Sequence, residues 1–206
     1  MKVNIINMSF GFDESDPELD EALRLAQSKD ILIFAAMANE GIYKAAAWPA
    51  RDSDNTIGIH SCAEMGKTSS PFTPKPSHER LDFMVLGENI FAHWLTGKGG
   101  GFRPVEGTSF ATPVAVSMAA LILAFTNQKV CRKLREETEK KVRVKDLGSN
   151  RGMRRLLRAI SEVSTDRYLW INPMLLWATF PEEGAEDTPG AMREHAWRVI
   201  HRALKK

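Results

Sequence analysis

The feature that most constrains this chain is a short glycine-led motif followed by a long stretch without charge. The motif reads Gly-Thr-Ser at 107–109, and residues 110–125 contain no Asp, Glu, Lys or Arg. This pattern predicts a buried helix with Ser109 in its first turn, where free N–H groups and the helix dipole favour an anion. Two interpretations stay open here. One is a Thr/Ser cap with Pro113 tolerated in the first turn, and the other is a nucleophile whose oxyanion forms at the helix end.

Apolar segments that suit buried strands alternate with a helical segment in the first part of the chain. Residues 3–8 and 31–36 read as strands, and between them Asp16-Pro17-Glu18 starts a helix of about a dozen residues. A strand, a helix and a strand with short connections predict a parallel pair with a right-handed crossover. Further strands are predicted at 56–60 and 81–86, and a hairpin at 90–95 and 101–106. The fold class is therefore α/β, with a mostly parallel sheet.

Small and polar residues follow both of the first two predicted strands. Ser9-Phe10-Gly11 ends the first strand, and Asn39 lies in the loop after the second. Carboxyl ends of parallel strands meet at one edge of a sheet, where α/β proteins build their sites. Alone, these segments are more often a strand-end turn and an ordinary loop. Their order ahead of Ser109 favours one joint site.

The net charge of +2 hides two halves of opposite sign. Residues 1–126 carry 10 Lys and Arg against 15 Asp and Glu, whereas residues 127–206 carry 18 against 11. This shift predicts a boundary near residue 127, followed by a basic, helical C-terminal extension that docks on the first part. Its expected segments are a helix at 129–145, an amphipathic helix at 153–163, an acidic linker at 181–190 and a last helix at 191–204. Apolar helix positions separate the arginines of 151–158, so a solvated helix face explains them better than nucleic-acid binding. We expect no nucleic-acid partner.

Cysteine usage and the apolar segments bear on the cellular setting. The two cysteines, Cys62 and Cys131, exclude a disulfide framework. Residues 1–7 lack the apolar core of a signal peptide, and the helix after Ser109, which comes closest to a membrane span, is better explained as a core helix. We therefore expect an intracellular protein without a membrane partner.

Several segments in this order resemble the subtilisin-like serine proteases (the subtilase, or S8, family). The stretch Gly107–Pro113 resembles the family's Gly-Thr-Ser-x-Ala-x-Pro nucleophile motif. Four more segments take part in the resemblance. Residues 35–41 resemble the oxyanion-hole loop and 6–11 the substrate-binding strand, while 48–50 and 82–94 lie at the family's usual places between them. The resemblance covers about 3–126. It implies part of the doubly wound, mostly parallel sheet of the subtilisin-like fold.

The resemblance also implies an activity and a set of site residues. Ser109 would be the nucleophile, and Asn39 would donate to the oxyanion beside the backbone N–H of Ser109. The substrate would be a peptide or protein, bound as an added strand and held by Ser9, Phe10, Gly11, Ala36, Met37 and Ala38. No cofactor is implied. Some subtilases bind calcium, but no acidic cluster in this sequence is assigned to it.

The sequence departs from the family pattern in two ways. The family has an Asp after an early strand and a His in a His-Gly-Thr motif, both well before the serine, and neither motif occurs here. His60, His78 and His93 fall in segments that are not catalytic in the family. His195 and His201 lie in the C-terminal extension, and all five are better explained as surface or packing histidines. The other departure is Ala38, which stands where the family has glycine and narrows the specificity pocket.

These departures lead to two hypotheses. In the first, residues 1–126 are the C-terminal part of a subtilase domain whose N-terminal part, with the Asp and the His, is missing, so that this chain alone is inactive. In the second, the chain is a non-catalytic subtilase remnant that serves as an interaction or structural module. We prefer the first, because a sheet cut in its middle leaves an apolar edge strand at 3–8 that needs a partner.

Overall fold

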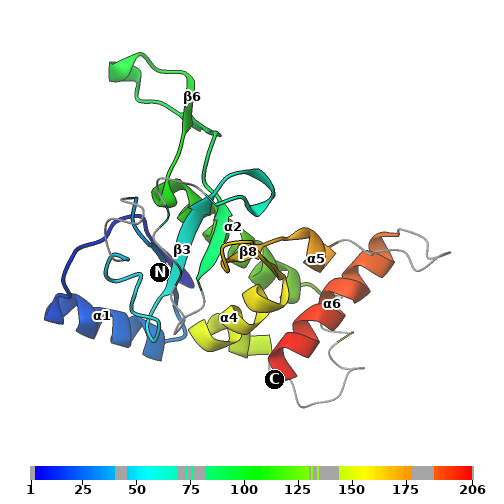
Figure 1. Cartoon of the computed structure of the whole chain (residues 1–206). Helices are drawn as coiled ribbons and strands as arrows, with labels where there is room; N and C mark the ends of the chain where they lie inside the picture. The colour runs from blue at the N-terminus through cyan, green and yellow to red at the C-terminus, as the bar shows by residue number, and fades with distance from the viewer. Residues whose placement is uncertain are drawn as a thin grey trace.

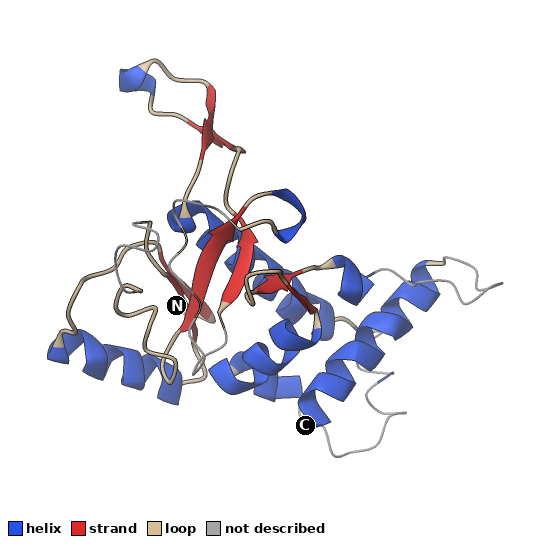
Figure 2. Cartoon of the chain, in the orientation of Figure 1, coloured by secondary structure: helices blue, strands red, loops and turns tan. Residues whose placement is uncertain are grey.

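The computed structural model has one central sheet of six strands with helices on both faces (Figures 1 and 2). The strand order is β1-β2-β3-β4-β8-β7, and all neighbours are parallel except β7 and β8. The residues that the structure describes are 3–39, 46–68, 73, 76, 82–129, 131, 134, 144–177 and 188–205. The α/β class with a mostly parallel sheet is thus confirmed.

The elements have the following bounds. The sheet strands are β1 Ile5–Met8, β2 Leu32–Ala36, β3 Ile57–Cys62, β4 Phe83–Leu86, β7 Ser161–Val163 and β8 Leu169–Ile171. The α-helices are α1 Pro17–Ser28, α2 Thr108–Thr126, α4 Asn150–Ala159, α5 Met174–Trp177 and α6 Pro189–Lys205. Short 3₁₀ turns occur at η2 Glu64–Gly66, η3 Thr96–Lys98 and η4 Val144–Gly148.

Strand β2 shows how the two faces of the sheet are covered. All five of its residues are buried, as expected for a strand with helices on both sides. Leu32 and Phe34 face the core that contains α2, while Ile33 and Ala35 face a second core that contains α1. Because successive side chains of β2 point to opposite faces, the sheet has one apolar core on each face.

Helix α1 begins and ends as the sequence predicts. The Asp16 side chain caps it by accepting a hydrogen bond from the N–H of Leu19 at 2.9 Å, and Pro17 occupies the first turn. Leu23 is its buried residue and packs in the second core. Because β1 and β2 on either side of α1 are parallel, the predicted strand–helix–strand unit is confirmed.

Helix α2 is the central helix of the larger core. Its Ala111, Ala115 and Ala119 are fully buried, and these small residues let the helix approach the sheet closely. By length and composition α2 is the one described helix that could cross a membrane. One face of it packs on strands β1 to β4, while Leu121 on another face is 64% exposed.

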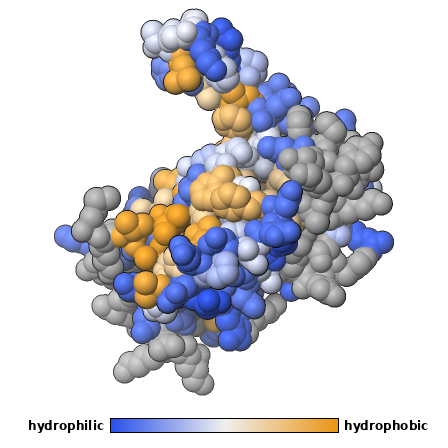
Figure 3. Space-filling model, turned by 90° about the vertical axis from the view of Figure 1, so that its left-hand side faces the viewer, coloured by the Kyte–Doolittle hydropathy of each residue, from blue (hydrophilic) through white to orange (hydrophobic). Residues whose placement is uncertain are grey.

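A hairpin projects from the body between β4 and α2. Its strands β5 Ile90–His93 and β6 Phe102–Val105 are antiparallel, which confirms the predicted pairing. The hairpin stands away from the body in Figure 1, and in Figure 3 it rises above an apolar patch on the face of the body turned to the viewer. Phe91 and Phe102 on it are 71% and 64% exposed.

The part of the chain after residue 127 is helical in α4, α5 and α6, and it also supplies two strands. Strand β8 pairs with β4 in parallel, so residues from both sides of the predicted boundary share one sheet. They also share one core, because Leu156 and Trp197 pack in the cluster that holds α2. Helix α4 ends at Ala159, four residues before the end of the amphipathic segment predicted at 153–163. Most of the helix predicted at 129–145 and the linker predicted at 181–190 lie outside the described residues.

Candidate active site

Ser109 is the second residue of α2, at the carboxyl edge of the sheet. The preceding Gly107 has φ +120°, a backbone conformation that glycine adopts without strain. The N–H groups of Phe110 and Ala111 bond to the Gly107 carbonyl, at 3.0 and 3.1 Å. The N–H of Ser109 has no acceptor among the described residues. It is therefore available to an anion at the helix N-terminus.

Asn39 lies beside this helix end, in the loop after β2. Its Oδ1 accepts hydrogen bonds from the backbone N–H of Thr108 at 2.8 Å and from the Thr108 hydroxyl at 2.9 Å. A Cβ on Gly107 would lie 3.0 Å from the same oxygen, so a side chain there would crowd Asn39. With Oδ1 held as an acceptor, Nδ2 is the Asn39 group that can donate to an oxyanion next to Ser109.

Ser9, after β1, is joined to Ser109 by two hydrogen bonds of opposite direction. The Ser9 hydroxyl donates to the Ser109 carbonyl at 2.8 Å, and the Ser109 hydroxyl donates to the Ser9 carbonyl at 3.2 Å. These contacts cross 100 positions of sequence. They fix the end of β1 against the first turn of α2.

A cavity of about 150 Å³ opens beside Ser109 and Asn39. Of the residues predicted to bind substrate, four line it: Phe10, Gly11, Ala36 and Ala38. Gly11 is needed for a close approach, because a Cβ there would lie 2.6 Å from the Ala47 Cβ. The predicted segments thus meet in space, although their roles in binding stay predictions.

Ala38 has an unusual backbone at this cavity. Its φ is +141°, a region that residues with a side chain rarely adopt and that costs about 1–3 kcal/mol. Glycine would adopt this conformation without that cost. Ala38 also lines the cavity, and the narrowing of the specificity pocket by its methyl group stays a prediction.

Met37 and Ser9 do not line the cavity. The Met37 side chain is 1% exposed and packs in the core with α1, and it lies where a Cβ on Gly58 would be. Its backbone is also engaged, because its N–H donates to the Ile59 carbonyl at 3.1 Å and its carbonyl accepts from the Ala47 N–H at 2.6 Å. A role for Met37 in binding substrate stays a prediction.

The sequence reasoning missed several residues of this site. Phe12, Asp13 and Ala47 also line the cavity, and Thr108 holds Asn39. Phe12 exchanges backbone hydrogen bonds with Trp48 at 2.7 and 2.9 Å, and its ring lies 6.2 Å from the Trp48 ring. Phe10 and Phe12, two positions apart, are the sequence feature that could have predicted an apolar wall of this cavity.

None of the described histidines contacts Ser109. His60 is fully buried in β3 and its Nε2 lies 3.0 Å from an Asp82 oxygen, while its ring packs on Tyr168 at 5.1 Å. His93 lies on the hairpin against Phe102, and His195 contacts the Leu175 carbonyl. A buried His–Asp pair inside the sheet links strands and has no access to a substrate. His78 lies outside the described residues.

The described residues include no group of three or more His, Cys, Asp or Glu side chains placed to hold a metal ion. A calcium site remains an expectation from the family alone.

Comparison with known proteins shows the family to which this chain belongs. The family model described as "Subtilase family" matches residues 1–159, which continues well past the boundary predicted at 127. The chain belongs to the subtilases, a family of serine proteases.

Two relatives and one solved structure illustrate the match. The chain is similar to the subtilisin-like protease het-Q2 of Podospora anserina, with 42% identity over 98% of this chain and 57% of that protein. It is similar to an intracellular serine protease of Paenibacillus polymyxa, with 32% identity over 66% of this chain and 40% of that protein. The patellamide maturation protease PatA has the same fold, with a TM-score of 0.63 at 23% identity over 96% of this chain and 62% of that chain.

The chain spans a different share of the length of each of the two relatives. The chain spans 57% of the length of the Podospora protein and 40% of the Paenibacillus protein. The Podospora match includes nearly all of residues 127–206, so this part of the chain is shared with that relative.

Proposed function

We propose that this chain carries the nucleophile and the oxyanion hole of a serine endopeptidase, which cleaves peptide bonds through an acyl-enzyme on Ser109. The observation that carries the proposal is the placement of Asn39. Thr108, the first residue of α2, holds the side-chain oxygen of Asn39, and Asn39 and Ser109 line the same cavity. This position supports a role for the Asn39 amide nitrogen as a donor beside the N–H of Ser109. Two donors beside one hydroxyl, with a cavity alongside, suit acyl transfer.

The chemistry follows from these positions. The Ser109 oxygen attacks the carbonyl carbon of the peptide as a base takes the hydroxyl proton, and the carbonyl oxygen becomes an oxyanion between Asn39 Nδ2 and the Ser109 N–H. The C–N bond then breaks, and the amine leaves with the proton that the base returns. Water attacks the resulting ester, passes through a second oxyanion in the same place, and frees Ser109.

In this proposal, the general base that takes the Ser109 proton lies on polypeptide beyond these 206 residues. The Ser109 hydroxyl donates to the Ser9 carbonyl, and no described histidine lies within hydrogen-bond reach of it. The relatives are also longer, since the chain spans 57% of the Podospora protease. A histidine and its orienting carboxylate from such a segment would complete the site, and the 206-residue chain alone would be inactive.

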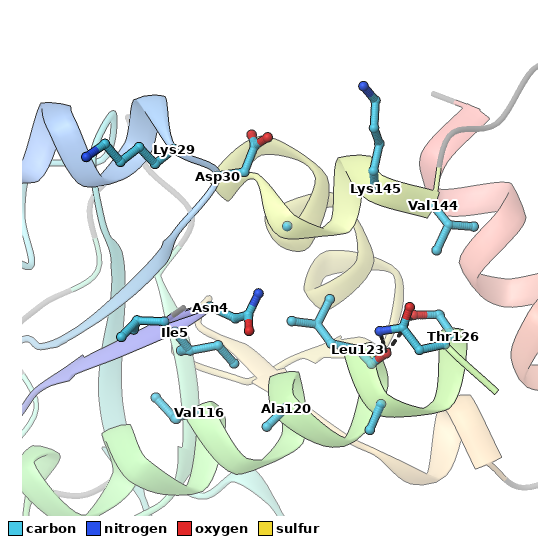
Figure 4. A pocket seen from close by; sticks show the side chains of 14 residues that line it. Asn4, Ile5, Lys29, Asp30, Val116, Ala120, Leu123, Thr126, Val144 and Lys145 are labelled. Atoms are coloured by element: carbon cyan, nitrogen blue, oxygen red, sulfur yellow. Dashed lines mark hydrogen bonds between the residues drawn. The ribbon is translucent and has the colours of Figure 1, made fainter. Parts of the chain in front are cut away.

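The sheet has an edge suited to such a segment. Strand β1 pairs with β2 on one side and, among the described residues, with no strand on the other. A groove of about 780 Å³ lies at the N-terminal end of this strand, between β1, α2 and the turn η4. Figure 4 shows Ile5 of β1 and Val116, Ala120 and Leu123 of α2 around it. Charged residues such as Lys29, Asp30 and Lys145 also line the groove, so the open edge of β1 is the feature that favours a further strand.

Labelling with a fluorophosphonate tests the proposal. The 206-residue chain should remain unlabelled, and a longer product that includes the upstream coding sequence should be labelled at Ser109. The Ser109→Ala variant of the longer product is the control and should stay unlabelled. Labelling of the short chain would show that a base exists within it. No in-frame Asp and His-Gly-Thr segments upstream, together with no labelling of any product, would favour the non-catalytic interaction module.

A further inference from the structure

A second cavity lies between helices α4 and α6, in the basic part of the chain. Its volume is about 620 Å³, and its lining comes from one face of each helix: Arg155, Arg158, Ala159, Val199, Arg202 and Ala203. The two helices pack on each other through buried apolar residues such as Leu156 and Ile200. The cavity is therefore part of a fixed helix pair, and half of its described lining residues are arginines.

The three arginines come from both walls of the cavity. Arg155 and Arg158 are three residues apart, which places them on one face of α4, and Arg202 comes from α6. The described residues of the lining include no Asp or Glu. Within the described part of the chain, none of the three forms a hydrogen bond or an ion pair. Three like charges around one cavity create a positive potential that an anion would neutralise.

Arg154 on the same helix shows the contrast with a structural arginine. Its guanidinium donates to the Thr56 carbonyl, and burial lowers its pKa from the ordinary value, with Asp54 and Asp52 acting in the opposite direction. Arg154 thus links α4 to the start of β3. Arg155, Arg158 and Arg202 have no such task in the fold.

We propose that this cavity binds an acidic polypeptide segment, with carboxylates on the arginines and an aliphatic side chain on the floor. Guanidinium groups match carboxylates in a two-point geometry. The floor residues Ala159, Val199 and Ala203 are small and apolar, so a bare ion would leave them uncovered. Among the residues that the structure describes, the lining has no aromatic ring on which a nucleic-acid base could stack. The volume falls within the range of about 300–1,000 Å³ that is typical of ligand sites.

Binding of a fluorescein-labelled peptide of alternating Glu and Leu, measured by anisotropy with the full chain, tests this site. The Arg155→Gln/Arg202→Gln double variant should weaken binding by at least about 10-fold, since each loses a charge-assisted contact. The matched control is Arg151→Gln/Arg198→Gln, which removes two exposed arginines from the same two helices, outside the cavity lining. It should change the dissociation constant by less than about 2-fold.

Equal losses in the two double variants would overturn the proposal, because they would show attraction to overall charge rather than to the cavity. No binding of the peptide by the parent chain would also overturn it. So would cavity-dependent binding of pyrophosphate or oligothymidylate without the peptide. Ser109→Ala should bind the peptide as the parent does, so the outcome is independent of the proposed proteolysis. Circular dichroism melting of each variant checks that it is folded.

Discussion

Asn39 and Thr108, 69 positions apart in sequence, are joined by two hydrogen bonds to one oxygen, at 2.8 Å from the backbone N–H and 2.9 Å from the hydroxyl of Thr108. The residue before the proposed nucleophile therefore orients the proposed oxyanion donor. A change in either side chain should act on the transition state more than on substrate binding.

Replacing Thr108 with valine tests this orientation. The substitution keeps the branched shape and removes the hydroxyl donor, so Asn39 keeps one of its two bonds. One hydrogen bond contributes about 0.5–1.5 kcal/mol, so kcat of the complete protease should fall about 3- to 10-fold with little change in KM. Thr108→Ser keeps the hydroxyl and should retain most of the activity. A change in KM alone would contradict a role in orienting Asn39.

Replacing Ala38 with glycine should stabilise the protein. The φ of +141° costs about 1–3 kcal/mol with a side chain present, and the added backbone entropy of glycine offsets about 0.5–1 kcal/mol of that gain. A net gain on the order of 1 kcal/mol should raise Tm by about 2–4 °C in a calorimetric scan. The control Ala36→Gly, in strand β2, should lower Tm instead. Equal effects at both positions would argue against strain at Ala38.

The parallel strands and the helices of the core were largely predictable from the sequence, whereas the strand pairing that completes the sheet was not. The turn chemistry at Asp16-Pro17 and the apolar runs at 31–36 and 110–125 act locally, so they predict α1, β2 and α2 correctly. The pairing of β8 with β4 depends on contacts between residues 83 and 169, which no local period encodes. Similarly, residues 161–163 have a helical pattern yet form β7, because β8 offers them an antiparallel partner.

At the candidate site, too, local motifs were predictable from the sequence and long-range contacts were not. Ser109, Asn39 and the segment 9–11 were found through motifs, and the fold brings them to one edge. The inward direction of Met37 was not found, since side chains alternate along β2 and its extension in a register that only the packed sheet defines. The role of Thr108 as donor to Asn39 depends on a long-range contact and could not be read from the motif.

Cys62 should show a pH effect that its burial dictates. Burial, with a smaller contribution from the charge of Glu88, raises the pKa of its thiol from 9.0 to about 12. The unfolded thiol loses its proton near pH 9 while the folded one keeps it, so stability from this group is complete below pH 9 and decreases between pH 9 and 12. Urea titrations should give a steeper decline over this range for the parent than for Cys62→Ala. Parallel declines would contradict the assignment to Cys62.

The buried pair of His60 and Asp82 should matter for stability and not for the chemistry. His60→Ala leaves the buried carboxylate without its imidazole partner, so the free energy of unfolding should fall by about 3–5 kcal/mol. His93→Ala, on the exposed hairpin, is the matched control and should cost no more than about 0.5 kcal/mol. Urea midpoints at constant m-value measure both. A small effect at His60 would show that the pair contributes little to the fold.

The position of β8 also has a consequence for the order in which the protein can assemble. Ser109 and Asn39 come from segments that leave the ribosome early, but strand β4, which leads into the hairpin and α2, gains its outer neighbour only from residues 169–171. During synthesis the nascent chain therefore carries the serine for about sixty residues before the sheet beneath it reaches its full width. The order of synthesis therefore separates the appearance of Ser109 from the completion of the sheet that carries it.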